Sequence, residues 1–185
     1  MEWGRPDETI GFIEHKTMRT VATGKINKFE TLNKAEFIIE LSAPLPVGVE
    51  AGYVIENLTC TPDAEIRNCH FGSCRARGLL VSTPGKVIIE NNVFESSCSA
   101  ILIAGDANAW YESGAVKDVL IRNNDFRYPC NSSLYQFCEA VISIDPEIPT
   151  PEQKYPYHRN IRIVDNTFHL FDYPILFARS VDALT

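Results

Sequence analysis

Aromatic and polar side chains gather in two stretches of the sequence, residues 105–114 and 145–160. The aromatic members are Trp110, Tyr111, Tyr155 and Tyr157, and the polar members are Asp106, Asn108, Glu112, Asp145, Glu147, His158 and Arg159. A pyranose ring has an apolar C–H face and a rim of hydroxyl groups, so aromatic rings surrounded by carboxylates and amides suit it. The pattern predicts a sugar-binding site that includes Asp106, Asn108, Trp110, Tyr111 and Glu112. The alternative is that the rings pack these segments onto the protein surface and the acids are solvated.

Two of these acids, Asp106 and Asp145, are candidates for a catalytic pair. Glycosidases use two carboxyl groups, about 5–5.5 Å apart in retaining enzymes and about 6.5–9.5 Å apart in inverting ones. Equivalent positions on stacked strands lie about 4.8 Å apart, and twice that two layers away. If Asp145 aligns with Gly105, the two aspartates fall within this range.

Arg75 and Arg77 are further candidates, because they precede a repeated strand that begins at Gly78. They would donate hydrogen bonds to substrate hydroxyl groups. The alternative is exposed acid–base stacking with residues such as Glu95 on the next layer, which is worth less than about 1 kcal/mol per pair.

A repeat shows which elements must position these residues. The pattern I-x-[ND]-[NC]-x-F occurs at residues 66–71, 89–94, 121–126 and 163–168, with spacings of 23, 32 and 42 residues. A small residue or Pro followed by β-formers comes after each copy, at residues 78–81, 100–103, 140–143 and 174–177. Repeats of this length indicate stacked supersecondary units that share one core.

The repeat predicts an all-β fold, a right-handed parallel β-helix over residues 53–185. Stacking places Ile on Ile and Phe on Phe inside the tube, and Asn suits the corners because it tolerates left-handed backbone geometry. The consensus of leucine-rich repeats is absent, and no long helical periodicity occurs. The longer spacings predict loops inserted at one corner, so residues 105–114 and 145–160 should lie side by side, with residues 127–139 at the opposite corner.

Residues 1–52 have a different pattern. Residues 9–14, 21–26 and 36–41 read as strands separated by polar turns. They predict a small antiparallel β-barrel or sandwich that ends near Gly52. Residues 54–58 are then expected to begin the first coil of the β-helix.

The amino-acid composition argues against some classes of binding partner. The 185 residues include 17 Lys+Arg and 24 Asp+Glu, which gives a formal net charge of −7. This acid excess argues against a nucleic-acid partner, and no apolar run approaches the roughly 20 residues that a membrane helix needs. The first residues do not resemble a signal peptide, which predicts either a cytosolic protein or a piece of a larger one.

The six cysteines are not spaced like zinc ligands, so no metal is expected. Most are expected to be small buried thiols in stacked strands. Cys130 and Cys138 bracket a polar loop and would form a disulfide in an oxidising compartment.

Five segments make the chain resemble the α-1,3-galactosidases of glycoside hydrolase family 110. They are residues 58–63 (L-T-C-T-P-D), 66–69 (I-R-N-C), 75–83 (R-A-R-G-L-L-V-S-T), 105–108 (G-D-A-N) and 110–116 (W-Y-E-S-G-A-V). The resemblance implies a catalytic β-helix that carries small β-barrel domains. It also implies hydrolysis of terminal α-1,3-linked galactose, as in blood-group B or linear α-galactosyl oligosaccharides, with inversion and without a metal or organic cofactor. A secreted or periplasmic location is expected for the parent enzyme.

One departure from the family pattern affects the catalytic residues. The family's catalytic aspartates include an Asp-Asp pair upstream of the small barrel, and this chain contains no Asp-Asp pair. The chain is therefore interpreted as a fragment with little or no hydrolase activity of its own, and no catalytic residue is transferred. The strand edges at the ends of a truncated tube are expected to pair with another copy, giving homo-oligomers.

Two other functions remain open at this point. A non-catalytic carbohydrate-binding or structural β-helix would need no catalytic pair. A polysaccharide lyase would need Ca²⁺-binding acids and a basic residue near a cleft, and nothing specific in the sequence indicates one.

Overall fold

A computed structural model describes residues 4–112, 114–130, 132, 139–149 and 154–185. All 17 regular elements in this part of the chain are β-strands. The chain divides into two compact units, one formed by residues 1–61 with 148–151 and the other by residues 62–147 with 152–185. Among the described residues, no helix has the length and hydropathy to cross a bilayer.

The first unit contains one four-stranded antiparallel sheet in the order β3-β2-β1-β4. Its strands are β1 (Thr9–Glu14), β2 (Arg19–Thr31), β3 (Phe37–Leu41) and β4 (Val54–Asn57). Ile10, Phe12 and Ile26 form its buried core. The predicted strands all occur, and β2 runs further than predicted.

Strand β4 differs from the expectation for residues 54–58. Instead of opening the first coil, β4 pairs antiparallel with β1, with Phe12 opposite Ile55. The two compact units divide between Thr61 and Pro62 rather than near Gly52. A short segment that begins with two β-formers, Val54 and Ile55, suits an antiparallel edge strand as well as a coil strand, so the residue types at 54–57 did not distinguish the two.

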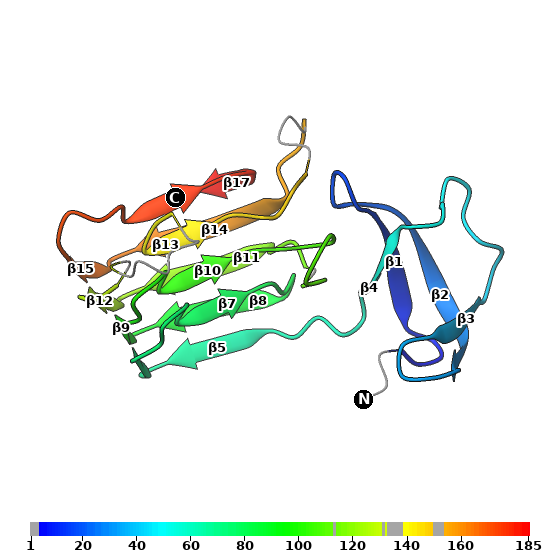
Figure 1. Cartoon of the computed structure of the whole chain (residues 1–185), viewed down its shortest axis with the longest axis horizontal. Coiled ribbons are helices and arrows are strands. Elements are labelled where there is room, and N and C mark those ends of the chain that lie inside the picture. The colour runs from blue at the N-terminus through cyan, green and yellow to red at the C-terminus, as the bar shows by residue number, and fades with distance from the viewer. Residues whose placement is uncertain (1–3, 113, 131, 133–138, 150–153) are drawn as a thin grey trace. The chain divides into compact units, whose positions relative to one another are not determined.

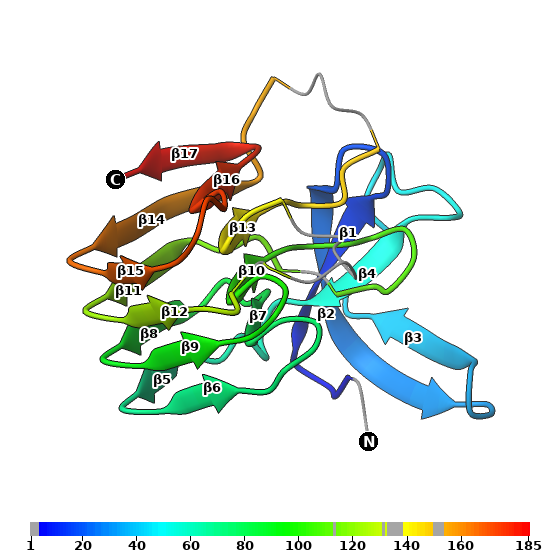
Figure 2. The same cartoon turned by 60° about the vertical axis from the view of Figure 1, so that its left-hand side comes forward.

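The second unit is a parallel β-helix, which confirms the predicted architecture (Figures 1 and 2). Each coil supplies one strand to each of three parallel sheets, here named sheets C, D and E. Sheet C contains β5 (Ala64–Arg67), β8 (Lys86–Glu90), β11 (Asp118–Arg122), β14 (His158–Val164) and β17 (Val181–Leu184). Sheet D contains β6 (His70–Gly72), β9 (Val93–Glu95), β12 (Asp125–Arg127) and β15 (Thr167–His169). Sheet E contains β7 (Leu79–Val81), β10 (Ile101–Ile103), β13 (Ile142–Ile144) and β16 (Leu176–Ala178).

Phenylalanines stack through the whole tube, as the repeat predicted. The ring centroids of Phe71, Phe94, Phe126 and Phe168 are separated by 4.9, 5.0 and 4.8 Å, and the rings are nearly parallel. The two central rings are fully buried. The strand register in sheet C also follows the repeat, because Ile89 pairs with Ile66 on one side and with Ile121 on the other.

Asparagines form a second column at the corner between sheets C and D. Asn68, Asn91, Asn123 and Asp165 have φ values of 53–57°, a left-handed geometry that Asn and Asp tolerate better than most residues. The next residue is buried in the second and third coils, where it is Asn92 and Asn124, and is exposed in the first, where it is Cys69. The Oδ1 atom of Asn124 accepts hydrogen bonds from the backbone N–H and Nδ2 of Asn92, both at 3.0 Å, and its own Nδ2 donates to the carbonyl of Ile89 at 2.9 Å. We call the column Cys69, Asn92, Asn124 and Asn166 the asparagine ladder.

The connections from sheet E to sheet C vary most in length. They comprise residues 82–85, 104–117, 145–157 and 179–180 in successive coils. The long segments 104–117 and 145–157 therefore leave the same corner of neighbouring coils, as the repeat spacing predicted. The connections from sheet D to sheet E occupy the opposite corner and include residues 128–141.

Candidate functional site

Segments 104–117 and 145–157 start side by side because β10 and β13 are hydrogen-bonded neighbours. Ile103 pairs with Ile144, and the backbone N–H of Asp145 donates to the carbonyl of Ile103 at 2.9 Å. The pairing continues beyond the strands, since the N–H of Glu147 donates to the carbonyl of Gly105, also at 2.9 Å. These contacts bring residues 104–112 and 145–147 together. We call these residues, with Tyr155 and Tyr157 later in the second segment, the loop site. Ser113 and residues 150–153 lie outside the described residues.

Asp106 organises the first of these loops. Its side chain is 3% exposed and accepts hydrogen bonds from the backbone N–H groups of Asn108 at 2.7 Å, Ala109 at 3.1 Å and Trp110 at 2.5 Å. Its own N–H donates to the carbonyl of Glu112 at 2.9 Å, which closes the loop. Burial raises the pKa of this carboxyl group, but the backbone donors outweigh burial and hold the pKa below its ordinary value. Asp106 is therefore an ionised anchor for the loop, and this state does not suit a proton donor.

Asp106→Asn tests this anchoring role. The amide keeps one acceptor but directs N–H groups at backbone donors, so we expect the amides of Asn108, Ala109 and Trp110 to exchange hydrogen about tenfold faster or more. Because the folded-state pKa is lowered, the stabilisation by Asp106 is complete above its ordinary pKa and disappears as the pH falls through the lowered value. Asp118→Asn is the control, since Asp118 lies in β11 and pairs with Arg162. Unchanged exchange in Asp106→Asn would show that the carboxylate does not hold the loop.

Asp145 has a different environment from Asp106. Its carboxylate forms an ion pair with Arg179 at 2.8 Å. Burial raises the pKa of the carboxyl group, and the charge of Arg179 opposes this shift without cancelling it. The register corrects the expected alignment with Gly105: with Ile144 opposite Ile103, Asp145 is level with Ala104, and Glu147 is the acid level with Asp106.

The aromatic side chains of the loop site fall into an exposed and a packed group. The exposed fractions of Trp110, Tyr111 and Tyr155 are 81%, 63% and 52%. Tyr157 instead packs over Gly105, where an added Cβ would lie 2.6 Å from the tyrosine ring. The structure therefore supports the packing alternative for Tyr157 and leaves the other three rings accessible to a ligand. Asn108 is exposed and its Nδ2 donates to the carbonyl of Glu147 at 3.3 Å.

His158 is buried, although the sequence indicated it as a donor to a ligand. It is 0% exposed, its ring lies edge-on to Tyr157, and its Nδ1 accepts a hydrogen bond from the backbone N–H of Val116 at 3.1 Å. Among the described residues, no group hydrogen-bonds to its Nε2. Burial lowers the pKa of the imidazole to about 3, so the ring is neutral and joins the end of the long loop to sheet C.

This burial predicts a pH-dependent stability. The unfolded state takes up a proton near pH 6.5 and the folded state only near pH 3, so stability is complete above about pH 6.5 and falls as the pH decreases towards 3. Between pH 7 and 5, His158 should lower the free energy of unfolding by about 2 kcal/mol. His158→Asn keeps an acceptor for the Val116 N–H without this titration, and its loss over the same interval should be smaller by about that amount. Equal losses in urea unfolding of the two proteins would contradict the assignment.

Arg75 and Arg77 lie away from the loop site. They are in the connection between β6 and β7, which enters sheet E at the end opposite to segment 104–117. Arg75 is exposed and Arg77 is partly buried. Glu95, the acid considered as a stacking partner, contacts the Nε2 of His70 at 2.8 Å and the Nη1 of Arg127 at 4.0 Å. The structure thus brings together five of the seven predicted substrate-binding residues and not the two arginines.

The cysteines only partly follow the expectation of buried thiols. Cys98 and Cys130 are buried, whereas Cys60 and Cys69 are exposed. Burial raises the pKa of the Cys130 thiol to about 11. Cys138 lies outside the described residues, and so does its pairing with Cys130. Within the described residues, no group of three or more His, Cys, Asp or Glu side chains is placed to hold a metal ion.

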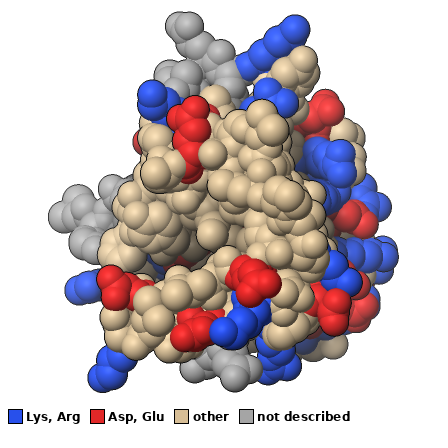
Figure 3. Space-filling view, turned by 90° about the vertical axis from the view of Figure 1, so that its right-hand side faces the viewer, with Lys and Arg blue, Asp and Glu red and all other residues tan. Residues whose placement is uncertain are grey.

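Charged side chains of both signs are mixed on the face shown in Figure 3. On the face in Figure 3, basic and acidic side chains are interspersed around the edge, and the centre is mostly uncharged. This distribution does not resemble the basic stripe of a nucleic-acid-binding surface.

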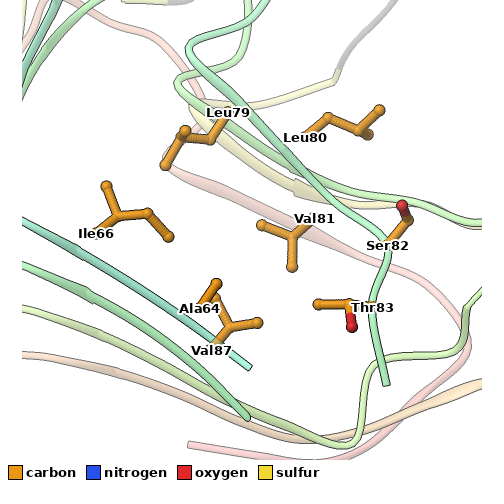
Figure 4. Close-up of a pocket in the computed structure, with 8 residues that line it drawn as sticks. All are labelled: Ala64, Ile66, Leu79, Leu80, Val81, Ser82, Thr83 and Val87. Atoms are coloured by element: carbon orange, nitrogen blue, oxygen red, sulfur yellow. The ribbon is translucent and has the colours of Figure 1, made fainter. Parts of the chain in front are cut away.

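An open cavity of about 190 Å³ lies at the first coil of the β-helix (Figure 4). It is lined by Ala64, Ile66, Leu79, Leu80, Val81, Ser82, Thr83 and Val87. None of these side chains is ionisable, so the cavity has no groups for acid–base chemistry.

The fold defines the class: this is a parallel β-helix protein with a preceding antiparallel β-unit, and one corner of the β-helix carries long loops with exposed aromatic side chains, Trp110 and Tyr111. Residues 1–55 match the family described as GLAA-B beta-barrel domain II. The chain is 95% identical over all 185 residues to alpha-1,3-galactosidase B of Bacteroides thetaiotaomicron, of which it covers 30%. It is 41% identical over 96% of its length to alpha-1,3-galactosidase A of Bacteroides fragilis, and 45% identical over 97% to alpha-1,3-galactosidase B of Akkermansia muciniphila, covering 29% and 23% of those proteins.

These matches confirm the resemblance to α-1,3-galactosidases along the whole chain. The chain spans less than a third of the length of these curated relatives.

Proposed function

We propose that this chain is part of an exo-acting α-1,3-galactosidase that removes terminal α-1,3-linked galactose with inversion. The observation that carries the proposal is 95% identity over the full 185 residues to a protein named alpha-1,3-galactosidase B. The proposed ligands are oligosaccharides of the blood-group B or linear α-galactosyl type.

In this proposal the loop site contacts the sugar. Trp110, Tyr111 and Tyr155 supply exposed aromatic faces, and the Asn108 and Glu112 side chains supply polar groups beside them. Stacking of a sugar on such rings needs no rearrangement of the β-helix, because the loop is already held by Asp106.

We further propose that this chain alone has little or no hydrolase activity. Asp106 accepts hydrogen bonds from three backbone N–H groups and Asp145 is ion-paired with Arg179. We therefore assign neither of these two candidates a catalytic role, and the general acid and base are expected elsewhere in the parent enzyme. For that enzyme we propose a secreted or periplasmic location.

The test compares binding and hydrolysis in one set of proteins. Galactosyl-α-1,3-galactose is titrated into the 185-residue chain by NMR, and Trp110→Ala should weaken binding about fivefold, since one stacked ring contributes on the order of 1 kcal/mol. Tyr128→Ala is the matched control, because Tyr128 is 56% exposed but lies at the opposite corner. Hydrolysis of a chromogenic α-galactoside is measured in parallel, with the full-length relative as the positive control.

The outcomes distinguish the proposal of sugar binding from the proposal that the chain lacks hydrolase activity. Binding without hydrolysis supports a substrate-contacting part of a larger enzyme. Turnover by the chain at the rate of the full-length relative would overturn the proposal that it lacks the catalytic acids. If the sugar does not bind, or if Trp110→Ala binds it as well as the unmodified chain, the loop site is not the contact surface, and a structural β-helix segment becomes the better interpretation.

A further inference from the structure

Glu147 is an exposed acid of the loop site whose backbone is fixed on both sides. Its N–H donates to the carbonyl of Gly105 at 2.9 Å, which extends the pairing of β10 with β13 beyond the strands. Its own carbonyl accepts a hydrogen bond from the Nδ2 of Asn108 at 3.3 Å. The Cα of Glu147 therefore has a defined position, although the side chain faces solvent.

The carboxylate of Glu147 differs from those of the two aspartates in the loop site. Asp106 accepts hydrogen bonds from the backbone of its own loop, and Asp145 is ion-paired with Arg179. Within the described part of the chain, no residue forms a hydrogen bond or an ion pair with the Glu147 carboxylate. Both of its oxygens are therefore open to a ligand that donates hydrogen bonds.

Asn108 presents a further acceptor next to Glu147. Its backbone N–H donates to Asp106 at 2.7 Å, and its Nδ2 donates to the Glu147 carbonyl, which directs the Oδ1 atom away from that contact. No residue with a described position donates to this Oδ1 atom, and the side chain is exposed. Oxygen acceptors without a neighbouring cation suit the hydroxyl groups of a neutral ligand better than a phosphate or a carboxylate.

The backbone of Tyr111 is an independent indication that this corner serves a ligand. Tyr111 has a φ of 56° and is 63% exposed, and it is the only aromatic residue with a positive φ in the described part of the chain. Bulky residues rarely adopt this geometry, and backbone strain of this kind is concentrated at binding and active sites. The strained residue immediately precedes Glu112, whose carbonyl closes the loop on the Asp106 N–H.

We propose that Glu147 is a specificity-determining residue for the sugar. Its carboxylate, together with the Oδ1 atom of Asn108, accepts hydrogen bonds from the adjacent 3- and 4-hydroxyl groups of a terminal galactose. This inference rests on the proposed function. Galactose carries these two hydroxyl groups in the cis arrangement and glucose carries them in the trans arrangement, so a carboxylate placed for the cis pair discriminates between the two sugars.

The experiment compares two disaccharides that differ only at C4 of the terminal sugar. Galactosyl-α-1,3-galactose and glucosyl-α-1,3-galactose are titrated by NMR into the 185-residue chain and into Glu147→Gln, with and without EDTA. Glutamine keeps the size of the side chain and one acceptor oxygen but removes the charge. It should weaken binding of the galactosyl disaccharide about tenfold and that of the glucosyl disaccharide less than about twofold.

Asp172→Asn is the matched control. Asp172 is an exposed acid in the connection between β15 and β16, at the opposite corner of the β-helix, so its substitution removes the same charge away from the loop site. This variant should bind both disaccharides as the unmodified chain does. The midpoint of urea unfolding should be unchanged in Glu147→Gln, because no described residue bonds to the carboxylate.

The results separate this inference from the proposed function. If Trp110→Ala weakens binding but Glu147→Gln does not, the proposed function stands and the inference is wrong. If the unmodified chain binds neither disaccharide, both fail. Equal weakening for the two disaccharides, or a lower urea midpoint in Glu147→Gln, would show a general or structural role and overturn the inference. Binding that EDTA abolishes would assign the oxygens to a cation and would also overturn it.

Discussion

Asn124→Ala should lower the free energy of unfolding of the β-helix by about 3–5 kcal/mol, because it removes the centre of the asparagine ladder. The side chain is 1% exposed. Its loss leaves the Asn92 N–H and the Ile89 carbonyl without partners in the interior, and each unsatisfied buried group costs about 1–3 kcal/mol. Urea unfolding followed by far-UV circular dichroism measures the change.

The neighbouring asparagine provides the control. Asn123 is exposed and has a φ of 53°, a geometry that glycine adopts readily. Asn123→Gly should therefore change stability by less than about 1 kcal/mol. Similar losses in the two variants would mean that corner geometry, not the ladder, stabilises the turn.

Phe126→Ala should also cost about 3–5 kcal/mol, the usual range for truncating a buried aromatic ring. The ring is 0% exposed and stacks between Phe94 at 5.0 Å and Phe168 at 4.8 Å. Neighbouring coils keep their 4.7–4.9 Å spacing through backbone hydrogen bonds, so the cavity left by the ring cannot close easily. Thermal and urea unfolding would measure the loss.

Phe171→Ala is the matched control for this truncation. Phe171 is 74% exposed and makes an edge-on contact with Tyr128 at 5.3 Å. Its removal should cost less than about 1 kcal/mol. If the two truncations were equally costly, the stacked column would not be the source of the stability.

The sequence predicted the β-helix well because its interior repeats by residue type. Like residues must coincide when coils stack, so the columns of Phe71 and Phe94 and of Asn92 and Asn124 could be found without coordinates. The difference in spacing between copies also located the corner that carries the long loops.

Features outside the repeat were harder to predict. The β-formers Val54 and Ile55 suit an antiparallel strand and a coil strand equally, and only their partner, β1, decides between the two. The offset between Asp145 and Gly105 is a single residue, which depends on where the strand pairing begins and not on the residue types.

The chemistry of individual site residues depended on contacts that the sequence does not contain. The sequence does not show whether an aspartate in a polar loop binds a ligand or, like Asp106, accepts hydrogen bonds from the backbone of its own loop. His158 and Ile161 in β14 are both fully buried, but they are three residues apart, and Asn160 between them has a left-handed φ of 54°. Strict alternation from Ile161 would have directed His158 outward, so its burial follows from this local irregularity and not from a pattern in the sequence.

The corner between sheets E and C accepts connecting loops of very different length, so these loops can be exchanged without changing the β-helix. Segments 82–85, 104–117, 145–157 and 179–180 differ several-fold in length, yet the strands that flank them keep one register. A segment 104–117 transplanted from a divergent relative should therefore leave the winding of the tube unchanged, provided that the graft supplies its own equivalents of Asp106 and the Val116 amide. Under the proposed function, such a graft would change the sugar preference.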